Sequence, residues 1–152
     1  MSRGTVSTGA MMKEGNSFCR QIDVEASPEN LREVRCFVEQ VSRELQLEGD
    51  DGYDLKVAVS EAAANAIEHS GAESFLEVCV TQYPDDRLTF EVSDEGNFHL
   101  SPRKPEQAGG RGLGLPLMVA LMDEVRIYRN SRGGTTVSLT LFLGEQQQRE
   151  TA

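Results

Sequence analysis

Two polar side chains in an alanine-rich segment could carry acid–base chemistry. Glu61 and Asn65 stand four positions apart among several alanines. On a helix this spacing puts a carboxylate and an amide on one face, and His69 extends that face by one more turn. The carboxylate could accept a proton from water or an alcohol, and the amide oxygen could bind Mg²⁺. The competing interpretation is a solvated polar helix face without chemistry.

An aspartate and a glycine form a second group. Asp94 and Gly96 stand at the end of a predicted strand, where the chain enters a long segment with few apolar residues. The carboxylate could hold an amino group, and the glycine would leave room for a ring to approach. An ordinary Asp-x-Gly turn is the competing interpretation.

A glycine-rich segment, residues 109–114, opens directly into a predicted helix. Backbone N–H groups and the positive end of a helix dipole bind anions, so this third group could cradle phosphates. It lacks the Gly-Lys-Ser/Thr of a Walker A loop. A flexible hinge is the competing interpretation.

The elements that must position these groups are predicted from apolar periodicity. A helix is expected to start at Ser27 and Pro28, with an apolar stripe at every third or fourth residue as far as Leu45. Two more helices are expected at 53–69 and 113–122. Alternating residues predict strands at 17–25, 75–82, 87–93, 125–129 and 135–142. This order predicts an α+β fold with helices on one face of a mixed sheet.

Composition restricts the partners. The chain has 15 Lys and Arg against 25 Asp and Glu, a net charge of −10, which argues against direct binding of nucleic acid. A nucleotide remains possible, because metal ions and backbone N–H groups can hold its phosphates. No apolar run is long enough to span a membrane. The three cysteines lack metal-site spacing and are expected to be free thiols of a cytoplasmic protein.

The predicted domain organisation is simple. Residues 1–16 show no periodicity and are expected to be disordered. Residues 17–143 are expected to form one domain. Residues 144–152 form a polar tail.

The order of the three groups resembles the GHKL, or histidine-kinase-like, ATPase superfamily. The stretch 59–69 is similar to its N box, Asp94-Glu-Gly96 to its first glycine box, and Gly110-Arg-Gly-Leu-Gly-Leu115 to its second. Within the superfamily, two segments are most similar to anti-sigma-factor serine/threonine kinases of the RsbW type. They are residues 59–69, V-S-E-A-x-x-N-A-I-x-H, and residues 112–125, G-L-G-L-x-L-x-x-A-L-M-D-E-V. The resemblance implies the Bergerat fold, a two-layer sandwich with helices on one face of a mixed, mostly antiparallel sheet. It also implies that residues 17–143 form a single ATP-binding kinase domain of the histidine-kinase-like type.

The resemblance also implies a role for each matching position. Asn65 would bind Mg²⁺ beside the ATP phosphates, Asp94 would accept a hydrogen bond from the adenine amino group, and Glu61 would be the general base. Gly96 would allow close approach of the ring, and His69 would belong to the ATP site. The phosphates would be held by the second glycine box, made of Gly110, Arg111, Gly112, Leu113, Gly114 and Leu115.

The implied function is phosphorylation of a STAS-domain anti-sigma antagonist, together with binding of a sigma factor by a homodimer, without contact with a membrane. Two alternatives stay open, a non-catalytic ATP-binding regulatory module and a histidine-kinase-type ATPase domain. Glu61 argues against the first, because a pure binder needs no base. The second is disfavoured because both histidines, His69 and His99, lie inside the domain.

Overall fold

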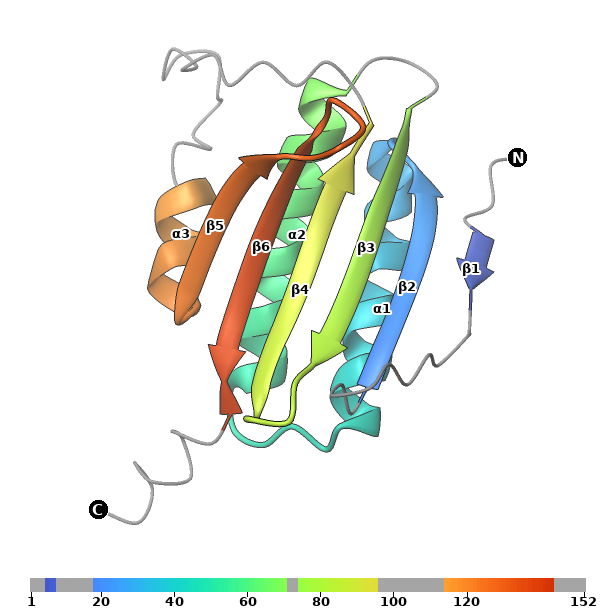
Figure 1. Ribbon diagram of the computed structural model, residues 1–152. Coiled ribbons are helices and arrows are strands. Elements are labelled where there is room, and N and C mark those ends of the chain that lie inside the picture. Colours follow the sequence, from blue (N-terminus) through green and yellow to red (C-terminus); the bar gives the residue numbers. More distant parts are fainter. Residues whose placement is uncertain (1–4, 8–17, 71–73, 96–113, 144–152) are drawn as a thin grey trace.

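The computed structural model describes residues 5–7, 18–70, 74–95 and 114–143, and Figure 1 shows a sheet with its helices packed on one face. The chain runs through two helices after the second strand, then a hairpin, a third helix and a second hairpin. The α+β prediction is therefore confirmed. The strands are β1 (Thr5–Ser7), β2 (Phe18–Glu25), β3 (Phe75–Gln82), β4 (Arg87–Asp94), β5 (Glu124–Arg129) and β6 (Thr135–Phe142). The helices are α1 (Leu31–Glu44), α2 (Asp51–His69) and α3 (Gly114–Leu121).

The sheet has the strand order β1-β2-β3-β4-β6-β5. Every described strand pair is antiparallel. Because β4 and β6 are neighbours, the end of β4 lies beside the turn that leads into β6, with Ser93 opposite Thr136. The arrangement thus brings Asp94 next to a segment that is far away in the sequence.

The core lies between the sheet and the helical layer. Alternate residues of the central strands, such as Val78, Phe90 and Leu139, are fully buried against the helices. This is the period of two that a half-covered strand requires. In α1 the buried positions Val34, Val38 and Val41 confirm the predicted stripe, and Phe37 adds an edge-on aromatic contact with Phe90 at 6.2 Å between ring centroids.

The first helix begins as its sequence predicts. Ser27 has an extended backbone, and Pro28 opens a short 3₁₀ turn, Pro28–Asn30, that continues into α1. Proline fits the first position of a helix because its missing N–H would have no partner there. The buried Asn30 side chain donates to the Glu25 carbonyl at 2.9 Å and so fixes the junction between β2 and α1.

One expectation needs correction. Residues 1–16 were predicted to be disordered, but Thr5–Ser7 form β1, which pairs with β2 from Thr5 opposite Asp23 to Ser7 opposite Gln21. Three residues are too few to show periodicity, and an edge strand of this length is held by the backbone ladder of its neighbour. The rest of that segment and the tail 144–152 lie outside the described residues.

None of the described helices combines the length and apolar character needed to cross a membrane. The three cysteines are free, as predicted: Cys36 is exposed, and Cys19 and Cys79 are half-buried.

Candidate active site

The predicted base and metal ligand lie on one face of α2. Glu61 and Asn65 occupy successive turns, and both are half-buried. Their neighbours Ala62, Ala63 and Ala66 are buried. Side chains this small let α2 lie close to the elements that it packs against, and a polar pair is thereby held on a rigid support.

Gly114, the first residue of α3, meets this pair. A Cβ atom at Gly114 would lie 3.2 Å from Asn65 Nδ2 and 3.5 Å from Glu61 Oε2. The first of these distances is shorter than an ordinary contact, so the start of α3 lies close against the two side chains. The N–H groups in the first turn of a helix lack partners within the helix and bind anions. The corner between α2 and α3 therefore suits a phosphate group beside a carboxylate and an amide.

Asp94 ends β4 and is only 2% exposed. The Thr135 N–H donates to Asp94 Oδ1 at 3.1 Å, and Asn130 Nδ2 donates to the Asp94 carbonyl at 3.0 Å. A buried carboxylate needs such partners, because its transfer out of water is costly without them. The predicted adenine-binding residue is thus a buried and oriented hydrogen-bond acceptor.

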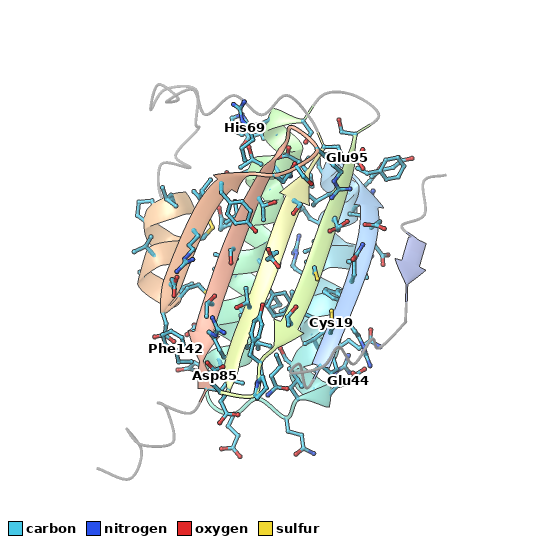
Figure 2. The ribbon with its side chains drawn as sticks, in the orientation of Figure 1. Cys19, Glu44, His69, Asp85, Glu95 and Phe142 are labelled. Atoms are coloured by element: carbon cyan, nitrogen blue, oxygen red, sulfur yellow. The ribbon has the colours of Figure 1, made fainter. Side chains whose placement is uncertain are left out.

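Two further predicted residues are placed by the structure. His69 is the last residue of α2, one turn beyond Asn65, and lies at the same end of the sheet as Glu95 (Figure 2). Leu115 is 46% exposed, so its side chain faces solvent and any contact with phosphate would come from its backbone N–H. Contact of either residue with a nucleotide stays a prediction. The remaining predicted residues lie outside the described part of the chain: Gly96, Gly110, Arg111, Gly112 and Leu113.

The donor set suits Mg²⁺ held partly by a substrate. Among the described residues there is no cluster of three or more His, Cys, Asp or Glu side chains that could hold a metal ion. Mg²⁺ usually takes few protein ligands and completes its shell with phosphate oxygens and water. The Asn65 amide beside the start of α3 fits that mode of binding.

Sequence reasoning missed part of the Asp94 environment. Residues 130–134 were interpreted as a plain hairpin turn, yet Asn130 and Thr135 bind Asp94 directly, and Gly134 packs on its backbone. An asparagine, a serine and two glycines within five residues predict the turn itself. Its cross-sheet partner depends on β6 lying next to β4, which no local pattern reveals.

Groups with displaced pKa values lie away from these residues. The pKa of Cys79 is raised to about 12, first by burial and then by Cys19 and nearby carboxylates. A hydrogen bond to Glu91, followed by burial, raises the pKa of Tyr128 to about 12. Both belong to the sheet face opposite the helices. Cys79 alternates with the buried Val78 and Val80, and Tyr128 bonds to Glu91, which alternates with the buried Phe90 and Val92. They lie away from the α2–α3 corner.

Comparisons with known proteins identify the family. The model of the histidine kinase-like ATPase domain matches residues 24–141. The serine-protein kinase RsbW of Bacillus licheniformis is 39% identical over 136 residues, which cover 80% of this chain and 84% of that protein. RsbW of Bacillus subtilis strain 168 is 35% identical over 153 residues, covering 91% and 94% of the two chains.

Solved structures agree with this fold. The RsbU and RsbW domains of a Mycobacterium tuberculosis protein match with a TM-score of 0.65 and 26% identity over 82% of this chain and 32% of that longer one. The SiaB–SiaC complex from Pseudomonas aeruginosa matches at a TM-score of 0.60 and 12% identity over 84% of this chain and 90% of that one, which shows the fold alone. The chain therefore belongs to the RsbW family of serine-protein kinases, built on the histidine kinase-like ATPase domain, and is a protein serine/threonine kinase.

Proposed function

We propose that the chain transfers the γ-phosphoryl group of Mg²⁺-bound ATP to a serine or threonine of a STAS-domain anti-sigma antagonist. In the same proposal a homodimer of the chain also binds a sigma factor, and phosphorylation of the antagonist decides which partner is held. The family supports this assignment, because its curated members are serine-protein kinases named RsbW. The observation that carries the chemistry is the position of Gly114, where a Cβ atom would lie 3.2 Å from Asn65 Nδ2 and 3.5 Å from Glu61 Oε2.

The residues of the α2–α3 corner have complementary tasks. Glu61 takes the proton of the substrate hydroxyl while the hydroxyl oxygen forms its bond to the γ-phosphorus and the bond to ADP breaks. Asn65 is the protein ligand proposed for Mg²⁺. Bound Mg²⁺ would neutralise the charge that develops on the phosphate oxygens. Backbone N–H groups at the start of α3 add fixed dipoles that need no reorganisation during the reaction.

Asp94 would act at the other end of the nucleotide. A buried carboxylate oxygen accepts a hydrogen bond from an amino group, and adenine carries one where hypoxanthine carries a carbonyl. Selection of adenine therefore comes from β4, whereas catalysis comes from α2 and α3. The two tasks can be removed separately by mutation.

The test is a phosphotransfer assay with [γ-³²P]ATP, Mg²⁺ and purified STAS-domain proteins of the source organism. We expect acid-stable label on one of them, because phosphoserine and phosphothreonine survive acid. Glu61→Gln keeps the size of the side chain and removes the base, so the rate should fall about 10²- to 10⁴-fold. ATP affinity, followed with a fluorescent ATP analogue, should stay within a few-fold of the parent value.

Glu48→Gln is the matched control. Glu48 is exposed in the connection between α1 and α2, so the same change of charge occurs away from the corner. This variant should phosphorylate at the parent rate. Acid-labile label would assign the reaction to histidine, and an undiminished rate in Glu61→Gln would exclude Glu61 as the base.

A further inference from the structure

The turn between β5 and β6 is organised around the side chain of Asn130. Its Oδ1 atom accepts N–H bonds from Arg132 at 3.0 Å and from Gly134 at 2.9 Å. Its Nδ2 atom donates to the carbonyl of Asp94 at 3.0 Å and to Thr136 Oγ1 at 3.3 Å. The reverse orientation of the amide would set oxygen against the Asp94 carbonyl, so the network fixes which end of Asn130 faces β4.

The contact with Asp94 occurs where the sheet ladder ends. Ser93 and Thr136 are the last paired residues of β4 and β6, and their hydroxyl oxygens lie 2.8 Å apart. At the next position the Thr135 N–H turns to the Asp94 carboxylate, at 3.1 Å from Oδ1. The Asp94 carbonyl takes its hydrogen bond from Asn130. The turn thus holds both the backbone and the carboxylate of Asp94.

Gly134 makes this approach possible. A Cβ atom there would lie 2.0 Å from the Asp94 carbonyl oxygen and 2.7 Å from Asp94 Oδ1. Arg132 adds ion pairs to Glu77 at 3.2 Å and to Glu95 at 3.5 Å, but these groups are partly exposed and such pairs contribute little. The contacts of the half-buried Asn130 and the buried Gly134 and Thr135 therefore dominate the placement of Asp94.

We propose that Asn130 is a positioning residue for nucleobase selection, acting through Asp94. This inference rests on the proposed function, in which the Asp94 carboxylate accepts the adenine amino hydrogen. By holding the Asp94 carbonyl from the β5–β6 turn, Asn130 fixes where the end of β4 leaves the sheet and hence where the carboxylate points. The base is then selected jointly by the end of β4 and the β5–β6 turn, which are separated in the sequence by α3 and β5.

The test compares dissociation constants for ATP and ITP, whose base carries a carbonyl in place of the amino group. Asn130→Asp keeps the acceptor for the N–H groups of Arg132 and Gly134 and removes the donor to Asp94. We expect ATP binding to weaken about tenfold, as for loss of one hydrogen bond. ITP binding should change less than twofold, because ITP has no amino group from which Asp94 could accept a hydrogen bond. The value of kcat with saturating ATP should stay within about twofold, because Glu61, Asn65 and the start of α3 are unchanged.

Asp85→Ala is the matched control. Asp85 Oδ1 accepts the Arg87 N–H at 3.3 Å in the turn at the opposite end of the sheet (Figure 2), so this variant also loses a side-chain contact of a hairpin turn. Its ratio of ATP to ITP affinity should equal that of the parent. An equal loss for both nucleotides in Asn130→Asp, or no loss for ATP, would overturn the inference.

Asp94→Asn separates this inference from the proposed function on which it rests. An asparagine there can donate to the carbonyl of ITP, so the preference for ATP should shrink or reverse. If Asp94→Asn leaves the ratio unchanged, the adenine contact proposed for Asp94 is wrong and the inference falls with it. If Asp94→Asn changes the ratio and Asn130→Asp does not, the adenine contact stands and the role of Asn130 is refuted.

Discussion

In each of the two hairpin turns of the sheet a side-chain oxygen accepts a backbone N–H, but only one of these side chains also contacts a distant strand. In the β3–β4 turn the Asp85 carboxylate accepts the N–H of Arg87, two residues away. In the β5–β6 turn Asn130 accepts two N–H groups of its own turn and also donates to Asp94, 36 positions earlier. Figure 1 shows the second turn beside the end of β4 and the first at the other end of the sheet. A side chain that organises a turn can therefore also organise a site, provided that the topology puts a partner in reach.

The largest expected difference concerns two adjacent glycines of the β5–β6 turn. Gly134→Ala places a methyl group 2.0 Å from the Asp94 carbonyl oxygen, so the unfolding free energy should fall by about 2–4 kcal/mol and ATP binding should be lost. Gly133 has φ of +82° with nothing within 4 Å of its Cβ position, so Gly133→Ala should cost about 1 kcal/mol of backbone strain. Urea denaturation measures both values. Equal costs would mean that Gly134 does not pack on Asp94 in solution.

A smaller effect is expected from two threonines of β6. Thr136 and Thr140 are both buried, and each lies within 3 Å of a hydroxyl on β4, at 2.8 Å from Ser93 and 2.9 Å from Thr89. Thr136→Val and Thr140→Val should each lower the unfolding free energy by about 1 kcal/mol, because a buried hydroxyl loses its partner. Weaker ATP binding is expected for Thr136→Val alone, since Thr136 also contacts Asn130. Equal ATP affinities in the two variants would show that the β5–β6 turn does not influence ATP binding.

The β3–β4 turn should tolerate a backbone change. Asp86 has φ of +61°, a conformation that favours glycine. In Asp86→Gly the relief of this strain and the added freedom of the unfolded chain oppose each other, so thermal unfolding should report a change within about 0.5 kcal/mol. ATP affinity should be unchanged. A loss of ATP affinity would show that the two turns are coupled through the sheet.

The smallest effect is a pH dependence of the unfolding free energy, caused by a tyrosine of β5, the strand that leads into the β5–β6 turn. Tyr128 donates to Glu91 Oε2 at 2.6 Å, and this hydrogen bond, with burial, raises its pKa to about 12 from an ordinary value near 10. The folded state then binds the proton more tightly than the unfolded state, so stability is full below pH 10 and falls as the pH rises toward 12. Tyr128→Phe should remove this component of the pH dependence in urea titrations. If the unfolding free energy falls equally steeply with pH in the parent and in Tyr128→Phe, another group causes the loss of stability at high pH.

Most of the fold could be predicted from the sequence, because each element carries its own period. The helix predicted at 53–69 is α2, Asp51–His69. The strands predicted at 75–82 and 135–142 are β3 and β6, with the same bounds. The position of Glu61 and Asn65 on one helix face was predicted for the same reason, since their relation is one turn of a single helix. β1 was missed because an edge strand of three residues is held by its neighbour.

The contacts around Asp94 could not be predicted in this way. The sequence identified Asp94 as a carboxylate at a strand end, but its partners come from a turn that follows another helix and another strand. Only the adjacency of β4 and β6 brings them together. Local patterns predict elements and the sites within one element, whereas a site between elements needs the strand order.

The bond between Asn130 and Asp94 also closes the chain into a loop that contains residues 95–129. The entropy of closing a flexible loop grows only with the logarithm of its length, about 0.6 kcal/mol for each doubling. Flexible residues inserted between Asp94 and Asn130 would thus add little to the cost of closing this loop. The number of residues between Asp94 and Asn130 is therefore a weaker constraint on this contact than the identities of Asn130 and Gly134, whose own atoms make it possible.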